Sequence, residues 1–168
     1  MPDFPTQDSR FLIPGPSGAL EVAVHVPPAV NQMRVGVICH PHPQYQGTMD
    51  NKVVTTIARA FTKENMLAVR FNYRGVGKSE GAFGDYEGEV EDLKAVLQWL
   101  KNHLPESRIT LAGFSFGAYI ALRGAAAVPH LERLLSIAPA VNNRDYEAVH
   151  EAIQVPWQII MGMADEVV

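Results

Sequence analysis

One serine in the chain has the neighbours that nucleophilic chemistry requires. Residues 113–117 read Gly-Phe-Ser-Phe-Gly, which is the Gly-x-Ser-x-Gly spacing of a nucleophile held on a sharp turn between a strand and a helix. Such a turn strains the serine backbone and lifts the hydroxyl above the sheet, and the flanking glycines let the strand and helix approach closely. We therefore predict that Ser115 is a nucleophile. The alternative is that the two glycines serve only helix packing.

A nucleophilic serine also needs N–H donors for the negative charge that develops on the carbonyl oxygen of its substrate. The turn places the N–H of Phe116 at the positive end of the following helix, which makes it the first predicted donor. An earlier loop reads His40-Pro41-His42-Pro43, and because proline has no N–H, His42 is the second predicted donor. We expect the His40 side chain to brace this loop. The alternative, a metal site at the two histidines, lacks further ligands in the sequence.

An acidic residue follows the last apolar run of the chain. Residues 161–168 read Met-Gly-Met-Ala-Asp-Glu-Val-Val. A catalytic histidine needs a carboxylate that orients its ring and stabilises its protonated form, and the chain order serine, acid, histidine is one of the known arrangements. We predict Asp165 as this acid, in preference to Glu166. The alternative is an ordinary solvated turn. No cofactor motif accompanies these residues, so we predict no cofactor and no metal.

A second glycine-rich loop invites a different interpretation. Residues 75–79 read Gly-Val-Gly-Lys-Ser and end like a phosphate-binding loop. That motif needs a glycine at position 72, which is Asn72, and a helix that begins directly after Ser79. The sequence meets neither requirement, so we predict no nucleotide site here.

These candidate residues need a framework that holds their loops together. Apolar runs bounded by turn-forming residues predict strands, and apolar residues at three- and four-residue steps predict helices between them. The alternation of strand and helix predicts an α/β fold with a mostly parallel sheet and helices on both faces, in a single domain over residues 1–168. The predicted strands are residues 19–26, 34–39, 66–73, 108–114, 131–138 and 157–161, and the predicted helices begin after Asn51 and span about 90–100, 116–127 and 146–152.

The bulk composition excludes several classes of protein. The 168 residues carry 14 basic and 18 acidic side chains, for a net charge of −4, with no basic cluster, so we expect no nucleic-acid partner. No apolar stretch approaches the roughly 20 residues that cross a bilayer, and residues 1–11 lack the layout of a signal peptide. Cys39 is the only cysteine, which precludes an internal disulfide. We predict a cytoplasmic protein that does not bind membranes, and leave its oligomeric state open.

Taken together, these motifs resemble those of a small, lidless member of the α/β-hydrolase superfamily. HPHPQYQGTMDNKVV resembles the oxyanion loop, RFNYRGVGKSEG the loop after the next strand, GFSFGAY the nucleophile elbow and GMADEVV the acid loop. The resemblance implies an α/β-hydrolase fold and esterase-like hydrolysis of a small acyl substrate, an ester or a thioester, through an acyl-enzyme. Four aromatic residues near these loops are candidates either for pocket walls or for simple packing: Tyr45, Tyr73, Phe114 and Phe116.

The chain departs from this pattern at one point. The family's catalytic histidine would follow a further strand after the acid loop, but the chain has only three residues beyond Asp165, and none of its six histidines has that place. We therefore expect a C-terminally incomplete domain that lacks the final strand and helix, and little activity from residues 1–168 alone. His150 is the first alternative as a base. The alternative function is a non-catalytic binding or scaffold protein with the same fold.

Overall fold

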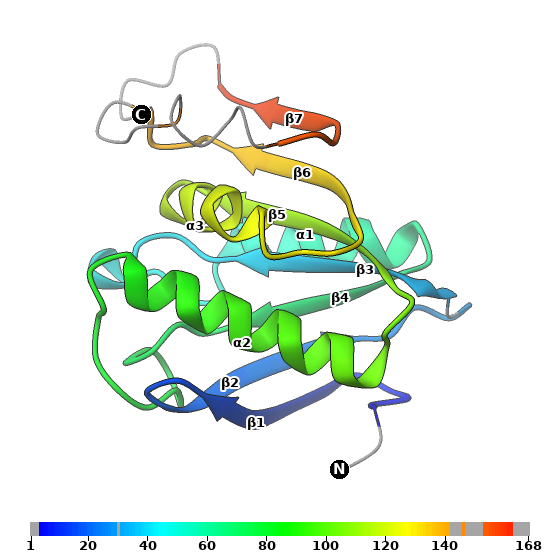
Figure 1. The fold of residues 1–168 in the computed structure, drawn as a ribbon, viewed down its shortest axis with the longest axis horizontal. Helices are drawn as coiled ribbons and strands as arrows, with labels where there is room; N and C mark the ends of the chain where they lie inside the picture. The colour runs from blue at the N-terminus through cyan, green and yellow to red at the C-terminus, as the bar shows by residue number, and fades with distance from the viewer. Residues whose placement is uncertain (1–3, 30, 142–145, 147–152, 163–168) are drawn as a thin grey trace.

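The computed structural model of the protein describes residues 4–29, 31–141, 146 and 153–162. A single seven-stranded sheet forms the centre of the molecule, and helices cover both of its faces (Figure 1). The elements in chain order are β1 (Ser9–Gly15), β2 (Gly18–His25), β3 (Asn31–Cys39), the short 3-10 helix η1 (Pro43–Tyr45), α1 (Lys52–Lys63), β4 (Met66–Phe71), α2 (Glu87–His103), β5 (Arg108–Phe114), α3 (Phe116–Ala125), β6 (Leu131–Ile137) and β7 (Trp157–Ile160).

The order of the strands in the sheet is β1-β2-β4-β3-β5-β6-β7. Strand β2 pairs antiparallel with β1 and with β4, whereas β4, β3, β5, β6 and β7 pair parallel with one another. The predicted mostly parallel sheet is therefore confirmed. Because the five parallel strands run in one direction, their carboxyl ends meet at one edge of the sheet, where the loops that carry the candidate residues begin.

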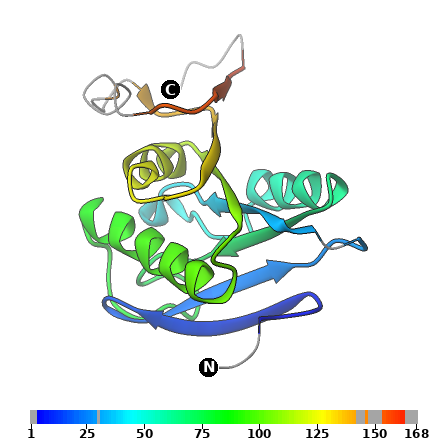
Figure 2. The same ribbon diagram turned by 45° about the vertical axis from the view of Figure 1, so that its right-hand side comes forward.

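Helix α1 packs on one face of the sheet, and α2 and α3 pack on the other (Figure 2). Side chains alternate along each strand, so the central strands supply both faces. In β3, Val35 and Val37 enter the larger core under α2 and α3, whereas Ile38 packs with Val54 and Phe61 under α1. The nearly continuous apolar runs in the sequence reflect this burial on two sides.

The six predicted strands are present, with ends that differ by no more than three residues. Strand β1 was not predicted, because Pro14 and Gly15 interrupt its pattern and it lies at an edge of the sheet with Leu12 exposed. Asn51 caps α1, since its side chain accepts the Val53 N–H at 2.8 Å. The predicted helix at 146–152 lies outside the described residues, except for Tyr146. No helix in the described part of the chain is long and apolar enough to span a membrane.

Candidate active site

Ser115 lies at the turn between β5 and α3 and has a strained backbone. Its φ of 53° and ψ of −117° lie in a region that residues with a side chain rarely adopt. The turn is held on both sides, because the Ser115 N–H donates to the Ile137 carbonyl at 2.9 Å and its carbonyl accepts the Ala118 N–H at 3.0 Å. The sharp strand-to-helix turn predicted from the sequence is present, and the Ser115 side chain is only half-buried.

The two glycines of this turn are required by close contacts. A Cβ atom at Gly117 would collide with the carbonyl oxygens of Cys39 and His40, and one at Gly113 would collide with the Gly117 carbonyl. The start of α3 therefore packs directly on the end of β3. The predicted steric role of the glycines is confirmed.

The loop after β3 lies beside this turn because Cys39 pairs with Gly113 in the sheet. His42 caps η1 through its side chain, since Nδ1 accepts the Gln44 N–H at 3.2 Å. Its ring centroid lies 4.6 Å from that of Phe116, which is the first residue of α3 and is 4% exposed. The structure thus brings together the two residues predicted as oxyanion donors.

His40 braces the same loop from below. Its ring is fully buried, and Nε2 accepts the Tyr73 N–H at 3.2 Å. That contact assigns the ring proton to Nδ1, which donates to the Pro41 carbonyl at 2.7 Å. Desolvation lowers the pKa of His40 to about 4, so the ring is neutral near pH 7. The expected bracing role is confirmed.

An aromatic cluster surrounds His42 and Phe116, and two of its members were missed in the sequence. Phe83 lies 5.1 Å from His42, and Tyr86 lies 5.0 Å from Phe116, both measured between ring centroids. The only sequence feature that could have pointed to these two residues is that both lie in a glycine-rich loop, three positions apart. Of the four aromatic residues considered from the sequence, Tyr73 is fully buried under the Phe116 ring and serves packing, whereas Tyr45 is 83% exposed.

A buried carboxylate holds the loop that carries Phe83 and Tyr86. Glu89 has no exposed surface, and its two oxygens accept the Gly84 N–H at 2.8 Å and the Tyr86 N–H at 2.9 Å. Burial raises the pKa of Glu89. Asp85 and Tyr86 both have positive φ, 52° and 74°, and the two hydrogen bonds offset the strain of this turn.

The Gly-Lys-Ser loop is hydrogen-bonded to the protein itself. Glu21, which is 3% exposed, accepts the Lys78 N–H at 2.9 Å and the Asn72 side-chain amide at 2.8 Å. The Ser79 hydroxyl donates to the Asn72 carbonyl at 2.7 Å and accepts the Glu21 N–H at 2.9 Å. A buried carboxylate therefore accepts the Lys78 N–H and ties the loop to β2, so the loop has a structural role.

Asp165 and His150 lie outside the described residues, so the acid remains a prediction. In the described part of the chain, no hydrogen bond joins Ser115 Oγ to a histidine. The ring of His25 accepts from Arg70 and contacts Asp8 at 3.0 Å, and the ring of His103 contacts the Trp99 carbonyl at 2.8 Å. The described residues also contain no group of three or more histidine, cysteine or acidic side chains that could hold a metal.

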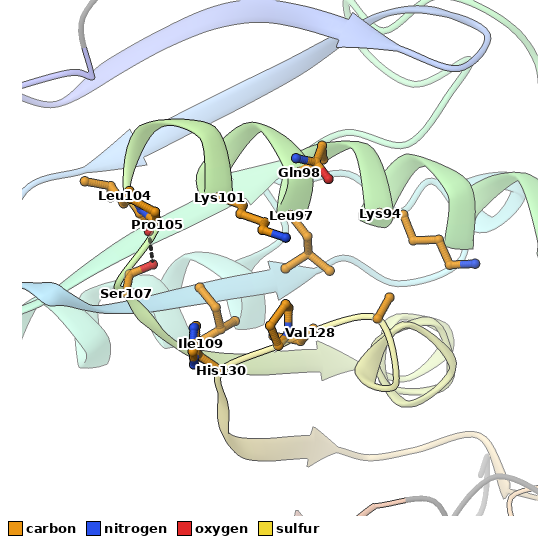
Figure 3. A pocket seen from close by; sticks show the side chains of 12 residues that line it. Lys94, Leu97, Gln98, Lys101, Leu104, Pro105, Ser107, Ile109, Val128 and His130 are labelled. Carbon is orange, nitrogen blue, oxygen red and sulfur yellow. Dashed lines mark hydrogen bonds between the residues drawn. The ribbon is translucent and has the colours of Figure 1, made fainter.

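A cavity of about 200 Å³ lies at the opposite end of the sheet (Figure 3). Its apolar floor includes Leu97 of α2 and Ile109 near the start of β5, with Lys101 and His130 at its rim. Ser115 follows the other end of β5. This cavity is separate from the candidate active site.

Comparisons with known proteins agree with this geometry. Residues 18–168 match the model of a family described as X-Pro dipeptidyl-peptidase (S15 family). An uncharacterized protein of Rickettsia prowazekii is 36% identical over 157 residues, which cover 92% of this chain and 66%, just under two thirds, of that protein.

Two solved structures are similar over nearly the whole chain. An α/β serine hydrolase homologue from Coxiella burnetii is 46% identical with a TM-score of 0.90, and the match covers 99% of this chain and 79% of that one. A lidless α/β serine hydrolase from Xanthomonas campestris is 44% identical with a TM-score of 0.91, over 100% of this chain and 77% of that one. The chain therefore belongs to the X-Pro dipeptidyl-peptidase (S15) family and has the α/β-hydrolase fold.

Proposed function

We propose that this protein is a serine hydrolase of the esterase type that acts on a small ester or thioester through Ser115. The observation that carries the proposal is the strained backbone of Ser115, with φ of 53°, at a turn held between β5, β6 and α3. Such strain persists only where the surrounding structure maintains it, and it is typical of functional sites. The similarity to α/β serine hydrolases at 44–46% identity supports the same proposal.

In the proposed reaction, Ser115 Oγ attacks the carbonyl carbon of the substrate, and the alcohol or thiol leaves as an acyl-enzyme forms. Water then releases the acid. The N–H groups of Phe116 and His42 stabilise the oxyanion. Support comes from the ring contact between these residues at 4.6 Å, and from the place of Phe116 in the first turn of α3, where a backbone N–H has no acceptor within the helix.

Asp165 is the proposed acid, and its task is to orient a histidine general base. The sequence supports this role, since Asp165 follows β7 and the order serine then acid agrees with the fold. The competing function is a binding or scaffold protein without chemistry. The strained backbone of Ser115 favours the enzyme, because such strain clusters at active sites and a scaffold has no need of it.

Labelling with a fluorophosphonate tests the proposal on the full natural chain. We expect one phosphonate adduct, located at Ser115 by mass spectrometry of peptides. Ser115→Ala should reduce the labelling rate by more than about a thousandfold, because the nucleophile is lost. Ser17→Ala, at an exposed serine, should label like the wild type. A folded protein that gains no adduct at Ser115 would favour the scaffold function.

A further inference from the structure

We propose that the acyl group of the substrate is aromatic, and that it is recognised by an aromatic rim formed by His42, Tyr45, Phe83 and Tyr86 around the buried ring of Phe116. This inference rests on the function proposed above and specifies its substrate class: an ester or thioester of an aryl or arylalkanoic acid. Tyr45 and Phe83 are the specificity-determining residues.

The rim is a closed arrangement of rings from three separate segments. Four rings follow one another in a circuit: His42 to Phe83 at 5.1 Å, Phe83 to Tyr86 at 6.0 Å, Tyr86 to Phe116 at 5.0 Å, and Phe116 to His42 at 4.6 Å. Aromatic rings favour offset or edge-to-face partners at about 4.5–7 Å between centroids. A flat ring of a ligand would meet such partners at the half-buried rings of His42, Phe83 and Tyr86, next to both proposed oxyanion donors.

Tyr45 extends the rim towards solvent. It is 83% exposed, which is more than any other large hydrophobic residue described. Its ring meets that of His42 edge-on, at 5.0 Å and 70°. The Tyr45 backbone is fixed because its N–H donates to the His42 carbonyl at 3.0 Å. Tyr45 thus offers a ring face that a substrate could cover beside the oxyanion loop.

The loop that carries Phe83 and Tyr86 is already ordered. Glu89, fully buried, binds the N–H groups of Gly84 and Tyr86 at 2.8 and 2.9 Å. A ligand that contacts these rings therefore loses little free energy to loop ordering. This rigidity favours selection among acyl groups by shape.

The strand order decides which part of the substrate faces the rim. The rim loops follow β3 and β4, which lie on one side of β5, whereas β7, the strand that precedes Asp165 in the sequence, lies on the other side of β5. The leaving group must lie near the base that protonates it, and Asp165 is proposed to orient that base. The leaving group therefore lies towards β6 and β7, and the acyl group lies towards the rim.

Two sulfonyl fluorides of different shape test this inference. Phenylmethanesulfonyl fluoride and methanesulfonyl fluoride both sulfonylate serine: the Oγ–S bond forms, the S–F bond breaks, fluoride leaves and the serine proton passes to a base or to solvent. The sulfonyl substituent takes the place of the acyl group. The measurement is the ratio of the two labelling rate constants at Ser115, followed by mass spectrometry of the full natural chain.

Substitutions that keep apolar volume but remove rings should lower the aryl preference. We expect the aryl-to-alkyl ratio to fall about tenfold in Tyr45→Leu/Phe83→Leu and about threefold in Tyr45→Leu alone, in line with the strength of aromatic contacts. Tyr45→Phe should keep the ratio. Leu12→Ala, at an exposed apolar position on β1, should change neither rate constant. Tyr45→Leu alone remains informative if the double variant unfolds, because Tyr45 is exposed.

The outcomes separate this inference from the proposed function. An unchanged ratio in Tyr45→Leu and the double variant, with Ser115 still labelled, overturns the aromatic acyl site and leaves the hydrolase intact. Equal falls in both rate constants also overturn it, because they indicate a structural role for the rim. A folded wild type in which neither reagent labels Ser115 overturns the proposed function and this inference with it.

Discussion

Two glycine-containing turns, residues 113–117 and residues 75–79, both follow parallel strands and both carry a serine. They differ in the hydrogen bonds that the serine makes. The Ser79 hydroxyl makes two hydrogen bonds, to the Asn72 carbonyl and from the Glu21 N–H. Among the residues that the structure describes, Ser115 makes hydrogen bonds only through its backbone, from its N–H and to its carbonyl. A functional motif in a sequence is therefore informative to the extent that the folded protein leaves its reactive groups available.

Gly117 and Gly75, one from each turn, differ in how closely their neighbours approach. Of the substitutions that test this difference, Gly117→Ala should have the largest effect on the free energy of unfolding. A methyl group at Gly117 meets two carbonyl oxygens of the β3 end, which cannot yield. We expect a loss of about 4 kcal/mol or more in the free energy of unfolding, at the upper end of single-residue effects. Urea unfolding followed by circular dichroism measures it.

Gly75→Ala is the matched control in the other turn. Its φ is 73°, and the nearest atom to an added Cβ is Ala82 Cα at 3.1 Å. The expected cost is about 1–2 kcal/mol, because left-handed backbone is unfavourable for alanine. Equal losses for the two glycine variants would contradict the close backbone packing assigned to Gly117.

His40 braces the loop beside the Ser115 turn, and its burial makes the stability of the protein depend on pH. The pKa of His40 falls from 6.5 to about 4 on folding because its ring is buried. Between these values the unfolded chain binds the proton and the folded protein does not. The free energy of unfolding is therefore unaffected by His40 protonation above pH 6.5. It decreases as the pH falls towards 4, by about 3 kcal/mol in total.

The measurement is the free energy of unfolding at pH 7.5 and 4.5 for the wild type and His40→Gln. We expect the wild type to lose more stability than the variant over this interval. Glu89, whose pKa is raised by burial, acts with the opposite sign in both proteins, so the difference between them isolates His40. Parallel pH profiles would show that His40 is not a buried neutral ring.

Glu21→Gln tests how the loop at residues 75–79 is held, and we expect a smaller change in the free energy of unfolding. The Glu21 carboxylate accepts from the Lys78 N–H and the Asn72 amide through one oxygen. The amide oxygen of glutamine can still accept both bonds, but it lacks the charge that strengthens them, so we expect about 1 kcal/mol of destabilisation. Fluorophosphonate labelling of Ser115 should persist under conditions where the variant is folded. An unchanged unfolding free energy would show that the charge of Glu21 does not stabilise this loop.

Much of the fold was predictable because local physics decides it. Alternating apolar residues specify a strand whichever partner it finds, and Asn51 caps a helix within its own turn. The antiparallel β1 was not predictable, since its short, interrupted pattern becomes a strand only through pairing with β2. The site follows the same division. Ser115 and its glycines form a local unit, whereas Phe83, Tyr86 and Glu89 meet Phe116 and His42 only after folding.

By itself the sequence determined the strand-to-helix turn at Ser115, because the steric needs of five consecutive residues set that geometry. It also determined the restriction of N–H donors between Pro41 and Pro43, a covalent property of proline. Only the tertiary structure decided that the rings of His42 and Phe116 touch, that Phe83 and Tyr86 complete a rim, and that Glu21 occupies the Gly-Lys-Ser loop. The reason is that the order of strands in the sheet, not distance along the chain, decides which loops meet.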